Sequence, residues 1–123
     1  MHEKPNKPRP AEEVLVCRPV NTRIVTAQDE IAAVYFWTDR LIFTVSTLPP
    51  GGRSSRDPGH KGADEVLYIT KGTMVVEFDQ IDRCELLNAG DGVLIPENEP
   101  HTIINPGDTV AECIFATAPQ LGY

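Results

Sequence analysis

The chain has few cysteines and a shortage of positive charge. Its three cysteines, Cys17, Cys84 and Cys113, are widely separated and form no CxxC pair, which excludes a disulfide framework and favours free thiols in a reducing compartment. Lysine and arginine total 11 against 18 aspartates and glutamates, giving a formal net charge of -7. Phosphate binding needs a basic face, so we expect no nucleic-acid partner.

Long apolar runs are also missing. No segment approaches the roughly 18 consecutive apolar residues that cross a bilayer, and the polar, proline-rich start lacks the apolar core of a secretory signal. We therefore expect no membrane association and a cytoplasmic location. At 123 residues the chain suits one compact core. The predicted organisation is a flexible N-terminal arm over residues 1–13 and a single domain over 14–123.

The spacing of prolines, glycines and apolar residues predicts short β-strands. The 11 prolines and 9 glycines are spread along the chain, and the apolar runs between them are rich in β-branched and aromatic residues. We expect about ten strands, little or no helix, and an all-β jelly-roll barrel or sandwich. Only residues 27–33 have a helical character. The predicted strands cover residues 14–16, 22–25, 34–37, 41–48, 65–70, 73–78, 84–87, 93–95, 101–104 and 110–116, and a long loop covers 49–62.

Histidine is scarce too, so few residues of this type are candidates for metal binding or catalysis. Of three histidines, His2 lies in the arm, leaving His60 and His101 in the domain. Glu65 opens an alternating strand and shares its side with Leu67 and Ile69, so its carboxylate should point into an apolar interior. An unpaired buried carboxylate is costly, so a metal ion or an arginine should lie beside it.

Glycine, proline, histidine and glutamate recur at fixed spacings in two blocks. The first block runs through Gly52, Pro58, His60, Glu65 and Gly72, and the second through Gly90, Pro96, Asn98, His101 and Asn105. These blocks resemble the paired motifs of the cupin superfamily, and the resemblance implies a small single-domain cupin, a jelly-roll β-barrel. The chain departs from the pattern at two positions. Pro58 stands where cupins usually carry their first histidine ligand, and Asn98 replaces a turn glycine, a mild change because asparagine tolerates a left-handed backbone.

The resemblance implies one divalent transition metal held by His60, Glu65 and His101. Two imidazoles and a carboxylate suit iron(II), and they also accept manganese, zinc, nickel or cobalt. Three consequences of losing the first histidine stay open. Water fills the vacant position, Asp57 supplies a fourth ligand, or the metal site has decayed and the barrel binds an organic ligand alone.

The predicted function is that of a metal-dependent enzyme acting on a small anionic or polyhydroxylated metabolite. Dioxygenase chemistry is slightly favoured over isomerase or decarboxylase chemistry, because a three-residue site leaves several coordination positions open. The alternative is a non-catalytic cupin that binds or senses a small ligand. In either case we expect a homodimer, in which residues 14–25 add a strand to a neighbouring sheet.

Two further sets of residues are candidates for roles in that function. The resemblance places Arg53, Arg56 and Lys61 near the pocket mouth, where they could bind an anionic group of the substrate. The sequence offers no clear general base, and Tyr68 and Glu97 are weak catalytic candidates.

Overall fold

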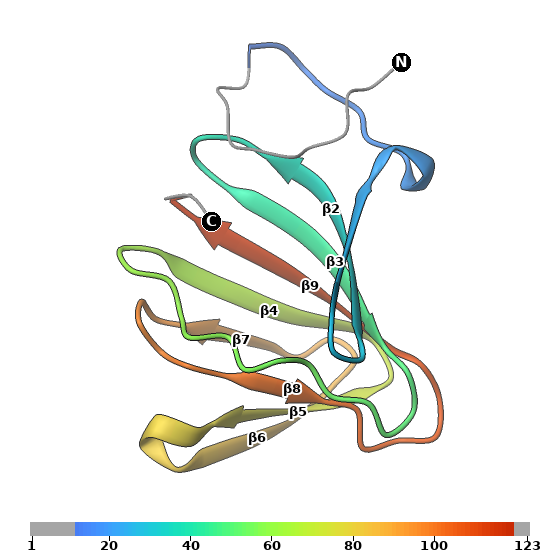
Figure 1. The fold of residues 1–123 in the computed structure, drawn as a ribbon, viewed down its shortest axis with the longest axis vertical. Coiled ribbons are helices and arrows are strands. Elements are labelled where there is room, and N and C mark those ends of the chain that lie inside the picture. Colours follow the sequence, from blue (N-terminus) through green and yellow to red (C-terminus); the bar gives the residue numbers. More distant parts are fainter. Residues whose placement is uncertain (1–11, 120–123) are drawn as a thin grey trace.

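The structure is a computed structural model that describes residues 12–119. Two antiparallel sheets form the body of the molecule. The larger sheet has the strand order β1-β2-β3-β9-β4-β7 and the smaller one β6-β5-β8 (Figure 1). The strands are β1 (Arg23–Ala27), β2 (Glu30–Trp37), β3 (Ile42–Leu48), β4 (Asp64–Lys71), β5 (Thr73–Phe78), β6 (Arg83–Asn88), β7 (Gly92–Ile95), β8 (Thr102–Ile104) and β9 (Ala111–Ala118). The predicted all-β jelly-roll architecture is confirmed.

The core lies between the two sheets. Strands β4 and β5 bury every second residue, as expected when one face of a strand packs inward and the other faces water. Side chains from both sheets meet there in one cluster: Leu48, Leu67, Ile69, Met74, Val76, Phe78, Leu87, Ile95, Ile103, Ala111 and Cys113. Of the three free cysteines, Cys113 packs in this core, whereas Cys84 is exposed and Cys17 half-exposed.

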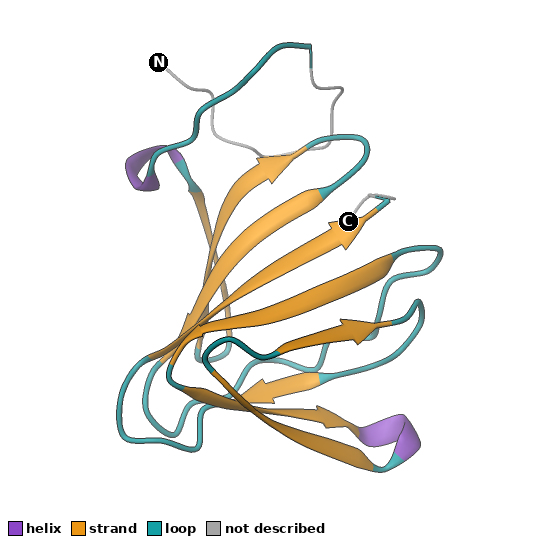
Figure 2. Cartoon of the chain, turned by 180° about the vertical axis from the view of Figure 1, so that it is seen from behind, coloured by secondary structure: helices purple, strands orange, loops and turns teal. Residues whose placement is uncertain are grey.

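Three details differ from the prediction. Residues 14–16 form no strand, so the described residues contain nine strands rather than about ten. Residues 27–33, expected to have helical character, form the turn and facing ends of the β1–β2 hairpin, with Gln28 at φ +60°. Two single-turn 3-10 helices, η1 (Pro19–Asn21) and η2 (Asp79–Ile81), are the only helices in this part of the chain (Figure 2). None of the helices in residues 12–119 has the length and apolarity needed to span a membrane.

The long loop before β4 is held against β8 by backbone hydrogen bonds. The amide of Asn105 donates to the Gly52 carbonyl at 2.8 Å, and that of Ser54 donates to the Ile103 carbonyl at 2.9 Å. Asp57 and His101 exchange both of their backbone hydrogen bonds, at 2.8 and 2.9 Å. Residues 51–57 therefore run beside β8 almost as a further strand, and they fix the position of Asp57. The predicted arm, residues 1–13, lies largely outside the described residues.

Candidate metal centre

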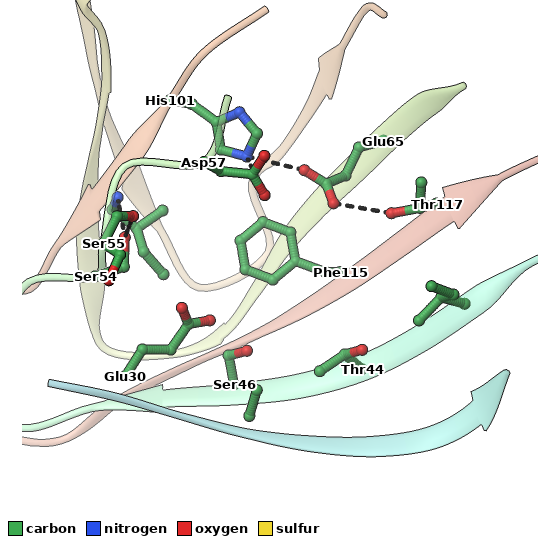
Figure 3. A pocket seen from close by; sticks show the side chains of 13 residues that line it. Glu30, Thr44, Ser46, Ser54, Ser55, Asp57, Glu65, His101, Phe115 and Thr117 are labelled. Carbon is green, nitrogen blue, oxygen red and sulfur yellow. Dashed lines mark hydrogen bonds and ion pairs between the residues drawn. The ribbon is translucent and has the colours of Figure 1, made fainter. Parts of the chain in front are cut away.

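A cavity of about 140 Å³ opens between the larger sheet and the 51–57 segment. Carboxylates, hydroxyls and one imidazole share its wall with a few apolar side chains (Figure 3). Its lining residues are Glu30, Ala32, Ile42, Thr44, Ser46, Ser54, Ser55, Asp57, Glu65, His101, Ile103, Phe115 and Thr117. The cavity is thus polar at both ends and small enough to limit any ligand to a modest size.

Glu65 enters this cavity from β4. Its register places it beside Thr117 of β9, and the Thr117 hydroxyl donates to Glu65 Oε2 at 2.8 Å. The residue is only 4% exposed and lies on the same face as Leu67 and Ile69, so the predicted inward orientation is confirmed. One carboxylate oxygen is thereby held by a neutral donor, while Oε1 has no hydrogen-bond partner among the described residues.

His101 reaches the same point from the start of β8. Its ring Nδ1 lies 2.9 Å from the carbonyl oxygen of Glu99, which can only accept, so Nδ1 carries the proton. That bond orients the ring and leaves Nε2 to face the cavity, the arrangement found in histidines that bind metals. Nε2 lies 2.9 Å from Glu65 Oε1, so these two buried atoms face each other as an ion pair, and neither has another hydrogen-bond partner within residues 12–119.

Asp57 completes a compact group of three ligand atoms. Because it is paired with His101 across the backbone, both side chains emerge on the same side, and Asp57 Oδ2 lies 3.7 Å from His101 Nε2. Suitable atoms of Asp57, Glu65 and His101 all lie within 4.8 Å of one another. Two carboxylates and an imidazole whose ligand atoms converge in this way form a donor set that fits a divalent cation.

His60 lies against this group from the turn before β4. Its Nε2 is 3.4 Å from Glu65 Oε2 and 3.6 Å from Asp57 Oδ2. The turn is held in place by Gly59, whose φ of +90° and close packing would bring a Cβ to 2.7 Å from the Glu99 amide. The structure therefore brings together all four residues that the sequence suggested as metal ligands.

The shared charges shift the pKa values within the group. Asp57, followed by Glu65, raises the pKa of His60 to about 10. Burial alone would raise the pKa of Glu65, but the neighbouring imidazoles outweigh it and hold that pKa below its usual value. Burial opposes the charged form of Asp57 too, yet His60 and the Gly59 amide lower its pKa. Without a metal, the carboxylates are thus ionised and His60 is protonated at neutral pH.

A pH dependence of stability follows for the metal-free protein. Because the folded-state pKa of His60, about 10, exceeds the ordinary value of 6.5, His60 contributes stability that is fully present below pH 6.5 and lost as the pH rises toward 10. We expect the melting temperature of the wild type, with a chelator present, to fall more steeply across this range than that of His60→Gln. Thermal melts followed by circular dichroism would show this, and parallel curves for the two proteins would contradict it.

The other candidates from the sequence lie away from the cavity. Arg53 pairs with Glu77 at 3.1 Å and Arg56 with Asp79 at 3.0 Å, both on the surface. Lys61 is exposed and does not line the cavity. Tyr68 is 41% exposed on the outward face of β4, and Glu97 lies exposed in the turn before His101. The geometry brings none of these five side chains into the cavity wall.

Sequence reasoning missed the far end of the cavity. Glu30 and Ala32 line it from β2, and Thr44 and Ser46 line it from β3. The signal was present in the polar Gln28–Asp29 pair, which is typical of a hairpin turn and would have placed Glu30 at the start of a strand.

A jelly-roll with a histidine and carboxylate cluster inside defines the class of small cupin proteins. The sequence profile of the Cupin_2 family, described as a cupin domain, matches residues 44–117, more than half of the chain. The protein therefore belongs to the cupin family, as its two motifs predicted.

The chain is also similar to individual proteins. Protein SchB of Streptomyces halstedii is 33% identical over 84 residues, a match that covers 64% of this chain and 59% of SchB. A crystal structure from Thermotoga maritima, described as a predicted oxalate decarboxylase, has a TM-score of 0.72 at 21% identity and covers 86% of this chain and 100% of that one. A cupin from Silicibacter pomeroyi, described as a sugar phosphate isomerase, has a TM-score of 0.72 at 16% identity, with 86% and 76% covered. At these identities the two structures show the fold alone.

Proposed function

We propose that the protein is a metal-dependent enzyme that acts on a small molecule held in the cavity. One divalent transition metal, bound by His60, Glu65 and His101 with Asp57 as a fourth ligand, would act as a Lewis acid beside the ligand. The observation that carries the proposal is the convergence of ligand atoms from Asp57, Glu65 and His101 at the cavity wall, all within 4.8 Å of one another. A bound cation would offset the repulsion between the two neighbouring carboxylates.

The cavity wall favours a hydroxylated substrate over an anionic one. Within residues 12–119 it contains no lysine or arginine, while Glu30, Asp57 and Glu65 all contribute carboxyl groups. An anionic tail would meet these carboxylates without a matched cation. Hydroxyl groups of a ligand can instead donate to the carboxylates and exchange hydrogen bonds with the side chains of Thr44 and Ser46.

Of the predicted reaction classes, isomerisation fits this arrangement best, because decarboxylation needs a carboxylate substrate. Isomerisation needs a polarised oxygen and a positioned proton-transfer group, and the cavity has carboxyl groups in place for the second task. The Silicibacter protein, which shares this fold, is described as an isomerase. Dioxygenation remains a prediction from the sequence.

Metal content tests the proposal. We expect about one iron, manganese, zinc or nickel ion per chain in untagged wild type purified without chelators. His101→Ala should lose the metal because it removes a buried ligand, whereas the surface control Glu97→Gln should keep it. Elemental analysis of the three proteins measures both effects. Wild type that stays metal-free after reconstitution would overturn the enzyme proposal and favour a non-catalytic ligand-binding cupin.

A further inference from the structure

A second carboxyl group faces the metal-binding cluster from the opposite end of the cavity. Glu30 is the first residue of β2, and its side chain points into the cavity from the wall near Ser46 (Figure 3). Its position is well fixed. The preceding turn is joined to the 51–57 segment by a Gln28–Ser54 bridge and by the amide of Asp29 donating to the Arg53 carbonyl at 3.2 Å.

Glu30 is held in surroundings unlike those of the other two cavity carboxylates. Asp57 and Glu65 lie against imidazoles, whereas no lysine or arginine among the described residues lines the cavity near Glu30. The titratable groups that act on it are Asp57, Glu65 and, more favourably, His101, and the Cys113 thiol lies close enough to feel its charge. Burial, with the two carboxylates, raises the pKa of Glu30, although Ser46 opposes the shift.

Two carboxyl environments that differ in this way commonly divide the work of a reaction between them. The group near the imidazoles stays ionised and binds a cation, while burial favours the protonated form of the isolated one, which suits it to take up and release a proton. The cavity between Glu30 and the metal-binding cluster has room only for a small ligand. A carbonyl held at the cluster would therefore present its neighbouring carbon toward Glu30.

We propose that Glu30 is the catalytic acid–base of the cavity, moving a proton to and from the carbon next to a carbonyl in a small, uncharged hydroxycarbonyl ligand. The inference rests on the proposed function. In the forward step the Glu30 carboxylate takes the proton and the C–H bond breaks. Its electron pair forms a C=C bond, and the carbonyl π pair moves to the oxygen, giving an enediolate. Return of the proton to the same carbon restores the ligand and the carboxylate. Return to the former carbonyl carbon gives the isomer when the hydroxyl proton of the ligand passes to the neighbouring alkoxide oxygen, so no oxidant or reductant is consumed.

The first readout is the ionisation of Glu30 itself. Carbon-13 NMR of zinc-loaded protein, with the Glu30 carboxyl signal assigned by its loss in Glu30→Gln, should give a titration midpoint above the ordinary glutamate value of about 4.3. A midpoint at or below that value would overturn the proposal. Unchanged zinc content in Glu30→Gln would show that the carboxyl group acts apart from metal binding, and loss of the zinc would instead make Glu30 a ligand and sink the inference.

The second readout is proton exchange with hydroxyacetone as the probe. In deuterium oxide, zinc-loaded wild type should exchange the hydrogens next to the carbonyl, as followed by proton NMR. Glu30→Gln should reduce the rate by about 100-fold or more. Glu30→Asp, which keeps a carboxyl group, should retain more exchange than Glu30→Gln, and the distant surface variant Glu85→Gln should match wild type.

The outcomes separate this inference from the proposed function. Wild type that binds no metal overturns the proposed enzyme and this step with it. Wild type that binds zinc but exchanges hydroxyacetone no faster than buffer overturns only the role of Glu30. Equal rates for wild type and Glu30→Gln would do the same, because the proton would then be moved by another group.

Discussion

Replacing Glu65 with glutamine is expected to weaken divalent metal binding by at least about 100-fold, since even partners that merely orient a metal ligand are worth 10- to 100-fold in affinity. Glutamine keeps the shape of the side chain and can still accept the hydrogen bond from Thr117. It removes the negative charge that the cation would face. The loss should therefore come from the site's electrostatics and ligand strength, with little change in packing.

Competition with a chromophoric chelator measures this loss. Asp64→Asn is the matched control, because Asp64 precedes Glu65 on β4 but lies exposed on the opposite face. Asp57→Asn distinguishes a three-residue site from a four-residue one, since only a four-residue site should lose affinity in that variant. A Glu65→Gln protein that binds metal within a few-fold of wild type would refute the assigned ligand set.

Truncating Leu67 to alanine is expected to lower the free energy of unfolding by about 3 kcal/mol, in the middle of the range for fully buried leucines. Leu67 has no exposed surface and lies between the two sheets in the main apolar cluster. Removing most of its side chain leaves a cavity that the paired strands on both sides of β4 cannot easily fill. The cost should thus exceed the simple transfer free energy of the lost carbons.

Urea denaturation of metal-free protein checks this value. Leu94→Ala provides the control, because Leu94 lies on the neighbouring strand β7 but is 63% exposed. That variant should change the stability by no more than about 0.5 kcal/mol. If the two variants lost similar amounts of unfolding free energy, burial in this core would not explain the destabilisation by Leu67→Ala.

The sequence predicted the parts of the molecule that depend on local pattern. Alternation along β4 placed Glu65 on the same face as Leu67 and Ile69, and the structure agrees. The left-handed backbone expected at Asn98 is present, with φ +62°. Motif spacing also singled out His60 and His101, which lie on either side of the same carboxylate. Such features follow from residue type and from the two-residue period of a strand.

Features that depend on distant pairing were harder to predict. Three of the seven residues at 27–33 are alanine, which suits a helix locally. The segment instead forms a hairpin that is fixed by pairing with β3 and the 51–57 segment. Misassigning that segment hid Glu30. Similarly, Arg53 pairs with Glu77 and Arg56 pairs with Asp79, each more than 20 residues away in the sequence. Their closeness to His60 in the sequence therefore did not predict where these side chains point.

The backbone pairing of Asp57 with His101 has a consequence for which cation the protein would prefer. It places a carboxylate beside the imidazole, close to the position where the cupin pattern has a histidine and this chain has Pro58. With Asp57 as a ligand, the donor set would contain two anionic oxygens and two nitrogens and would be chemically harder than one with a third histidine. Harder sets favour manganese(II) and iron(II) over the softer copper ions. We therefore expect the proposed site to bind manganese(II) or iron(II) in preference to copper.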